Sequence, residues 1–179
     1  MSEDMKINAA AALYSSQTPD KNALSTFVLQ LKRDGLSVGG ILQEPVRDDE
    51  GKIIGVDAIA LDNGDRFPIV RPSKTDLAAG SCGLNQSVLT ESSLVLRRAI
   101  AAKVHLIVVE KFGEREQLGE GLADDILSAM AEGIPVLVAV PMQAKEKWVE
   151  FTGGLGDLLL SELPLLENWW AQIQNEKAD

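Results

Sequence analysis

The sequence has few of the residues that build common catalytic and metal sites. It contains one cysteine, Cys82, and one histidine, His105, among 179 residues. A single cysteine excludes an internal disulfide, and a single histidine excludes a metal site made of several histidines within one chain. No Ser–His–Asp or Cys–His catalytic set can be assembled from these residues.

Positive charge is also scarce, with 17 Lys and Arg against 27 Asp and Glu and a net charge of −10. Nucleic acids and anionic membranes are polyanions, so this balance disfavours both as partners. It leaves room for a local anion site built from backbone N–H groups. No apolar run approaches the ~20 residues of a membrane helix, and no leader pattern precedes residue 20. We therefore expect a cytoplasmic protein.

The clearest pattern that is present lies between residues 105 and 141. A short apolar run at 106–109 ends on Glu110, and a polar loop punctuated by glycines follows. An amphipathic helix at 122–131 and a second apolar run at 134–140 complete the pattern. This strand–loop–helix–strand unit predicts two parallel strands. Ligands bind such units where loops leave the carboxyl ends of the strands.

The first half of the chain adds further elements. A buried strand is expected within residues 6–14, and the apolar spacing of residues 24–31 predicts a helix that Gly35 closes. The apolar run at 36–42 predicts a strand that ends at Pro45.

Two tight turns follow, at residues 48–51 and 62–65, and they predict antiparallel strands at 53–61 and 66–70. Beyond a loop at 71–84, a helix is expected from Asn85, its cap, to about Lys103.

The last third of the chain is less regular. A helical turn is expected around residues 148–151, and residues 158–160 fit either a short strand or a helical turn. A helical stripe that includes Trp169 and Trp170 follows, and its rings need covering, by the core or by an interface. Together these patterns predict one α/β domain over residues 1–179. Its three layers contain a mostly parallel sheet, helices on both faces and an antiparallel hairpin excursion near residues 45–70.

The first candidate binding loop is residues 15–22, SSQTPDKN, between a predicted strand and a predicted helix. Its spacing is that of a phosphate-binding loop, but only Lys21 matches that motif, and Asn22 stands where a hydroxyl belongs. Asp20 replaces a glycine and places a carboxylate where a phosphate would sit. The alternative is an ordinary helix start, with Thr18 or Asp20 as its cap.

The second candidate loop begins at Glu110, where a carboxylate at a strand end can hold a hard cation together with Glu114 and Glu116. Lys111 and Arg115 favour the alternative, a charge-balanced solvated loop.

Glycines punctuate the same loop. Gly119 and Gly121 precede the helix at 122–131 and either admit an anion to its free N–H groups or serve a tight turn. Elsewhere, Cys82 in the segment SCGLN is a thiol before a helix, or more simply a small buried residue. The sequence assigns no metal and no cofactor.

Several motifs together resemble a bacterial family known as domain of unknown function 2478. They are VEKFGEREQLGEGL, GIPVLVAVP, the Trp-Trp pair, SCGLN and DGLSVGGILQEP. The core of the resemblance is K-F-G-x-x-E with its glycines, made of Lys111, Phe112, Gly113, Glu116, Gly119 and Gly121. The resemblance implies a role in molybdenum handling, because members are usually encoded near molybdate transport genes.

The layout is also similar to phosphate-loop nucleoside triphosphatases. The chain departs from them in two places, because the glycines of the loop are missing and Glu110-Lys111 replaces an Asp-Glu pair. We therefore expect a binding or accessory protein that does not hydrolyse nucleotides. Its ligand would be a small oxyanion such as molybdate, or a phosphate-bearing molecule.

The expected ligand-binding residues lie in three strand-end loops. They are Lys21, Asn22, Cys82, Asn85, Glu110, Lys111, Gly113, Glu116, Gly119 and Gly121. Two other hypotheses remain. One is a divergent Mg-dependent triphosphatase with Lys21 on phosphates and Glu110 on Mg²⁺. The other is a protein-interaction module, a homo-oligomer that uses the Trp169–Trp170 face.

Overall fold

A computed structural model describes residues 7–70 and 86–178 of the chain. Within these residues the strands form one seven-stranded sheet in the order β4-β3-β2-β5-β6-β1-β7. The strands are β1 (Ala9–Tyr14), β2 (Val38–Arg47), β3 (Ile53–Ala60), β4 (Arg66–Val70), β5 (Leu106–Glu110), β6 (Val136–Pro141) and β7 (Asp157–Leu160). The helices are α1 (Ala23–Arg33), α3 (Gln86–Ala102), α4 (Glu114–Gln117), α5 (Ala123–Ala131), the 3₁₀ turn η1 (Met142–Ala144), α6 (Lys145–Thr152) and α7 (Leu163–Ala178).

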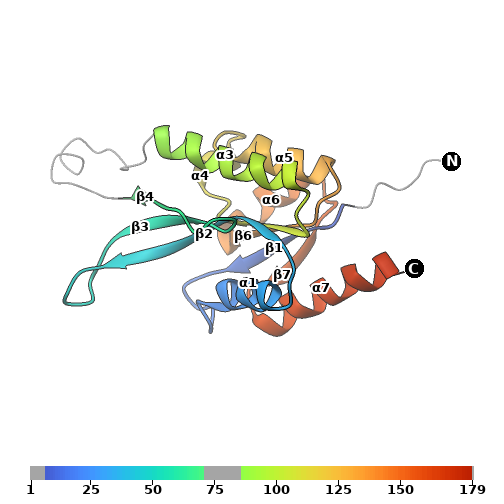
Figure 1. Ribbon diagram of the computed structural model, residues 1–179, viewed down its shortest axis with the longest axis horizontal. Helices are drawn as coiled ribbons and strands as arrows, with labels where there is room; N and C mark the ends of the chain where they lie inside the picture. Colours follow the sequence, from blue (N-terminus) through green and yellow to red (C-terminus); the bar gives the residue numbers. More distant parts are fainter. Residues whose placement is uncertain (1–6, 71–85, 179) are drawn as a thin grey trace.

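The sheet combines a parallel part with an antiparallel extension. Strands β2, β5, β6, β1 and β7 pair in parallel, whereas β2–β3 and β3–β4 pair antiparallel. The β2–β3 hairpin projects from the left of the molecule in Figure 1, on the side where the carboxyl ends of the parallel strands lie. The predicted α/β class, the parallel pairing of β5 with β6 and the hairpin excursion are all confirmed.

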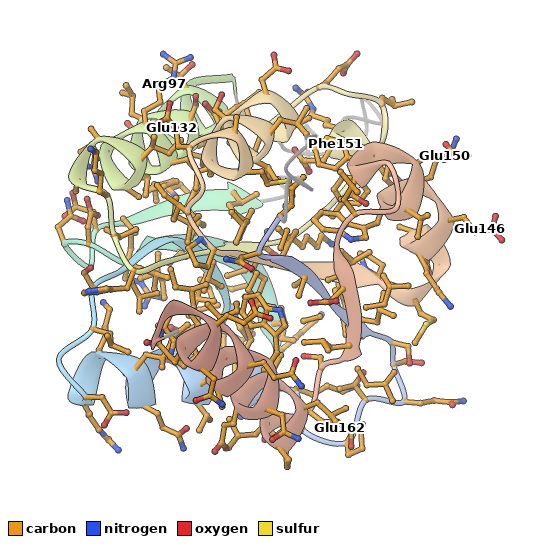
Figure 2. The ribbon with its side chains drawn as sticks, turned by 90° about the vertical axis from the view of Figure 1, so that its right-hand side faces the viewer. Arg97, Glu132, Glu146, Glu150, Phe151 and Glu162 are labelled. Atoms are coloured by element: carbon orange, nitrogen blue, oxygen red, sulfur yellow. The ribbon has the colours of Figure 1, made fainter. Side chains whose placement is uncertain are left out.

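Helices cover both faces of the sheet and create two apolar cores. Helices α3, α5 and α6 cover one face, and α1 and α7 cover the other (Figure 1). Alternate residues of each strand enter opposite cores: Ala9 and Ala11 of β1 face α5 and α6, whereas Ala10 and Ala12 face α1 and α7. Figure 2 shows the same three layers from the side, with Glu146 and Glu150 of α6 turned outward.

Helix α1 follows the predicted apolar spacing. Leu24, Phe27, Val28 and Leu31 are all buried against the sheet and α7. Gly35 follows the helix with φ of +84°, and the N–H of Leu36 donates to the carbonyl of Leu31 at 3.0 Å. Glycine adopts this left-handed conformation without a steric penalty, so it ends the helix as predicted.

Two boundaries differ from the sequence prediction. Strand β2 runs through Pro45 to Arg47 rather than ending at the proline, and Pro45 pairs with Val56 of β3. Beyond Ile41, β2 no longer pairs with β5, so the proline lies where β2 has a free edge and its missing N–H is tolerated. The loop predicted after Glu110 contains a short helix, α4, which the sequence analysis did not predict because the segment is rich in glycine and polar residues.

The C-terminal third is more regular than expected. The helical turn near Trp148 is a full helix, α6, and residues 157–160 form the edge strand β7. Trp169 and Trp170 are buried against α1 and the sheet, so the pair serves the core. Within residues 7–70 and 86–178, no helix combines the length and apolar character needed to cross a membrane.

Candidate functional site

The carboxyl ends of three parallel strands meet at one edge of the sheet. Strand β6 lies between β1 and β5, so Tyr14 at the end of β1 and Glu110 at the end of β5 flank the end of β6. The loops that carry Lys21 and Lys111 leave from these ends. The two predicted binding loops therefore emerge at the same edge of the sheet, as the parallel topology requires.

The loop of residues 15–22 is closed on itself. The ammonium of Lys21 donates hydrogen bonds to the carbonyls of Ser15 and Ser16, at 2.9 and 2.8 Å. The N–H of Ser15 donates to the hydroxyl of Thr18 at 2.8 Å, and the N–H of Asn22 donates to the carboxylate of Asp20 at 2.9 Å. An anion that recruits Lys21 must replace the two carbonyl oxygens.

These contacts also decide the start of α1. Asn22 occupies the N-cap position, and no side chain makes a capping hydrogen bond there. Thr18 and Asp20 instead accept hydrogen bonds from Ser15 and Asn22. The two residues proposed as caps therefore shape the loop before the helix.

Glu110 is a buried carboxyl group with one identified partner. Its Oε1 accepts a hydrogen bond from the N–H of Gln43 at 2.7 Å. Burial raises the pKa of Glu110, and the Gln43 hydrogen bond and the nearby Lys111 charge oppose that rise.

Tyr14 shows that the two strand ends influence each other. Burial, followed by the charge of Glu110, raises the pKa of Tyr14 to about 12. The phenol and the carboxyl group therefore share one poorly solvated region across β6. Sequence analysis did not select Tyr14, although its position at the end of the first strand was a usable signal.

Glu116 holds the turn after Glu110 together. Its Oε1 accepts from the N–H of Gly113 at 2.9 Å, and its Oε2 accepts from the N–H of Leu122 at 3.0 Å. Both carboxylate oxygens of Glu116, a predicted ligand residue, thus accept hydrogen bonds from the backbone of its own turn. The carboxylate fixes the path of the chain between β5 and α5.

Gly119 and Gly121 take left-handed conformations, with φ of +80° and +60°. A Cβ at Gly121 would lie 1.9 Å from Oε2 of Glu116, and the N–H of Gly119 donates to the Glu116 carbonyl at 3.1 Å. Leu122 N–H at the start of α5 is also taken, by the Glu116 carboxylate. This geometry supports the tight-turn interpretation of the two glycines more directly than anion binding.

A cleft of about 350 Å³ opens beside this turn. Its apolar lining comes from the sheet, from α3 and from the residue before α5, and its polar lining comes mainly from the β5–α5 turn. The lining residues are Ile41, Gln43, Ile69, Val88, Leu89, Ser92, Glu110, Lys111, Gly113, Glu114, Arg115, Glu116 and Leu122.

A second cavity, of about 580 Å³, is lined by Asn22 and Gln43 together with residues of α1, β2 and β3. Gln43 lines both cavities, so they are neighbours, but the predicted loops do not share one cavity: among the described residues, Lys21 lines neither of the two and the β5–α5 turn lines only the first. Four of the predicted ligand residues, Glu110, Lys111, Gly113 and Glu116, line the first cleft. Sequence analysis missed Gln43 because only the pairing of β2 with β5 places it beside Glu110.

Two of the predicted ligand residues, Cys82 and Asn85, fall outside the described residues. His105 is at the amino edge of the sheet, where its Nδ1 accepts from the N–H of Ser37 at 2.9 Å, so this contact gives it a structural role. Among the described residues, no group of three or more His, Cys, Asp or Glu side chains is placed to hold a metal ion.

Comparison with known proteins found a family and a partial relative. The family described as "Protein of unknown function (DUF2478)" matches residues 9–169. The "Molybdenum import ATP-binding protein ModC 2" of Bradyrhizobium diazoefficiens is 40% identical over 161 residues, which are 90% of this chain and 18% of that protein. The chain thus spans less than a fifth of the relative's length. No solved structure matches the chain.

Proposed function

The chain belongs to the DUF2478 family, and from that premise we propose that it is a non-hydrolytic binding protein for a small anion in molybdenum handling. The observation that carries the proposal is that two loops, each with a lysine, leave the same edge of the sheet. Lys21 comes from the β1–α1 loop and Lys111 from the β5–α4 loop, in a chain of net charge −10. Cations gathered at strand ends, where ligands bind in open α/β sheets, favour an anionic ligand.

The link to molybdenum comes from the relative rather than from the geometry. A protein named for molybdenum import contains a stretch 40% identical to most of this chain. We infer that the two stretches serve the same pathway, with molybdate or a phosphate-bearing molecule as the ligand.

The chemistry of the first loop supports the proposal that the protein does not hydrolyse nucleotides. Asp20 stands where a phosphate-binding loop has glycine, and its carboxylate is bonded within the loop. A phosphate-loop triphosphatase needs an open phosphate cradle lined by glycines, and the loop of residues 15–22 does not supply one.

Calorimetric titration tests the proposal. The protein would be titrated with molybdate, tungstate, phosphate and ATP with Mg²⁺, alongside the variants Lys21→Ala and Lys111→Ala and the control Lys52→Ala in the distant hairpin turn. We expect heat with at least one anion and roughly tenfold weaker binding in one or both loop variants. Absence of heat with all four would reject the proposal. Phosphate release from ATP that is lost in Lys21→Ala would establish the hydrolytic alternative.

A further inference from the structure

The cleft beside the β5–α5 turn has an apolar floor and a charged rim. The floor is formed by Ile41 of β2, Ile69 of β4, Val88 and Leu89 of α3, and Leu122 before α5. Ile41, Val88 and Leu122 are buried in the same core, and Ile69 and Leu89 pack against its border. A cleft of about 350 Å³ lies within the size range of small-molecule sites.

The charged lining of the cleft consists of two cations, Lys111 and Arg115, and three carboxylates, Glu110, Glu114 and Glu116. Lys111 is exposed, Arg115 is half-buried, and neither side chain forms an ion pair within residues 7–70 and 86–178. By contrast, Arg66, Arg97 and Arg98 all pair with carboxylates. Glu110 and Glu116 accept hydrogen bonds from backbone N–H groups, which offset part of their negative charge, whereas the two cations are left to attract an anion.

A bare inorganic oxyanion uses the rim of this cleft alone, whereas a phosphate-bearing organic molecule uses both the rim and the floor. Such an ion would satisfy Lys111 and Arg115 and leave the apolar floor facing water or facing the charge itself, which is unfavourable. A molecule with an apolar body covers the floor and gains free energy in proportion to the buried apolar area. The size, the floor and the rim therefore select the same kind of ligand.

We propose that this cleft binds an organic anion whose ring-sized apolar body lies on Ile41, Val88, Leu89 and Leu122 and whose acidic group is held by Lys111 and Arg115. The inference rests on the proposed function, because it uses the same strand-end edge, and it names the class of ligand. Gln43 and Glu110 line the same cleft and supply polar groups for the body of the ligand.

Two fluorescent probes that differ in one acidic group test the inference. 8-Anilinonaphthalene-1-sulfonate carries a sulfonate, and N-phenyl-1-naphthylamine has the same ring system without it. We expect the sulfonate to bind with one equivalent per chain and to bind the intact protein more tightly than the neutral probe.

The variants separate charge from apolar contact. Lys111→Ala and Arg115→Ala are each expected to weaken sulfonate binding about tenfold and to leave the neutral probe unchanged. Leu89→Glu should weaken both probes, and Lys145→Ala on α6, exposed and outside the cleft, should weaken neither. Amide NMR shifts on sulfonate binding should concentrate in the turn of residues 111–122.

Equal affinity of the two probes, or unchanged sulfonate affinity in both rim variants, would overturn the inference. So would the absence of sulfonate binding. These failures are distinct from failure of the proposed function. Heat with inorganic anions that depends on Lys21, without sulfonate binding at the cleft, would keep the function and reject the ligand class. Sulfonate binding at the cleft without heat from any inorganic anion or nucleotide would keep the ligand class and reject the proposed function.

Discussion

The ionisation of Glu110 affects the pKa of Tyr14, because the two side chains share a poorly hydrated region at the strand ends. Neither group can ionise without cost there, and ionisation of one makes ionisation of the other more costly. The chain contains one tyrosine, so its titration can be followed without ambiguity. This pair gives a direct measure of how closely β1 and β5 converge.

Replacement of Glu110 by Gln should lower the pKa of Tyr14. In the parent protein the phenol should titrate near 12, and in Glu110→Gln nearer to its ordinary value, since only the burial contribution remains. The measurement is the near-ultraviolet absorbance of the phenolate against pH. Because the folded pKa is raised, the stability that Tyr14 contributes is complete below pH ~10 and is lost as the pH rises towards 12.

The control for this titration is Glu114→Gln, which alters an exposed carboxylate on the neighbouring turn. It should leave the midpoint of Tyr14 in place. Identical midpoints in the parent and in Glu110→Gln would show that the two groups are not close.

At the scale of elements, the β5–α5 connection depends on a side chain rather than on a long helix. Helix α4 has four residues, which is too short to be stable alone. Glu116 compensates by accepting hydrogen bonds from both ends of the turn, at Gly113 and Leu122. Lys111 and Arg115 owe their positions on the cleft rim to this turn.

Glu116→Ala should therefore loosen the turn. Two backbone N–H groups lose their acceptor, so we expect a loss of about 1–3 kcal/mol in the free energy of unfolding. Urea unfolding would measure the loss, and faster hydrogen exchange at the Leu122 amide would locate it. Glu114→Ala, which alters an exposed residue of the same short helix, should change the free energy of unfolding by less than ~0.5 kcal/mol. Equal stability of the two variants would show that the hydrogen bonds to Glu116 do not stabilise the turn.

At the scale of the whole molecule, the β2–β5 pair joins the antiparallel extension to the parallel part of the sheet. Gly40 lies in this junction, opposite Val108, with φ of +110°. A Cβ at Gly40 would lie 1.9 Å from the carbonyl oxygen of Val108, where no flexible side chain can move aside. The close approach of the two strands thus depends on a missing side chain.

Gly40→Ala should destabilise the protein globally, by roughly 3–5 kcal/mol, because the strands must separate or distort. Gly64→Ala is the matched control. Gly64 has φ of +79°, and a Cβ at this position would have no heavy atom within 4 Å, so only backbone strain of about 1–2 kcal/mol is expected. Thermal unfolding followed by circular dichroism would compare them. A similar loss of stability in both variants would show that the contact between residue 40 and the Val108 carbonyl is not the cause.

Much of the fold was predictable because local patterns agree with the final packing. The apolar spacing of α1, the turn residues of the β2–β3 hairpin and the apolar runs of β5 and β6 each indicate one structure. The boundary at Pro45 was wrong because its tolerance depends on which neighbour β2 has at that point, which is a property of the sheet. Helix α4 was missed because a carboxylate at Glu116 stabilises it rather than a periodic apolar face.

The sequence by itself determined the class of fold, the family and the positions of the candidate loops along the chain, since strand periodicity, turn chemistry and the motif around Lys111 are local properties. Only the tertiary structure decided what those residues do. Strand order brought Tyr14 towards Glu110, burial made their ionisation costly, and the packing of α3 opened a cleft beside Lys111 and Arg115. Contacts between distant segments carry no local signal, because they form only when the sheet assembles.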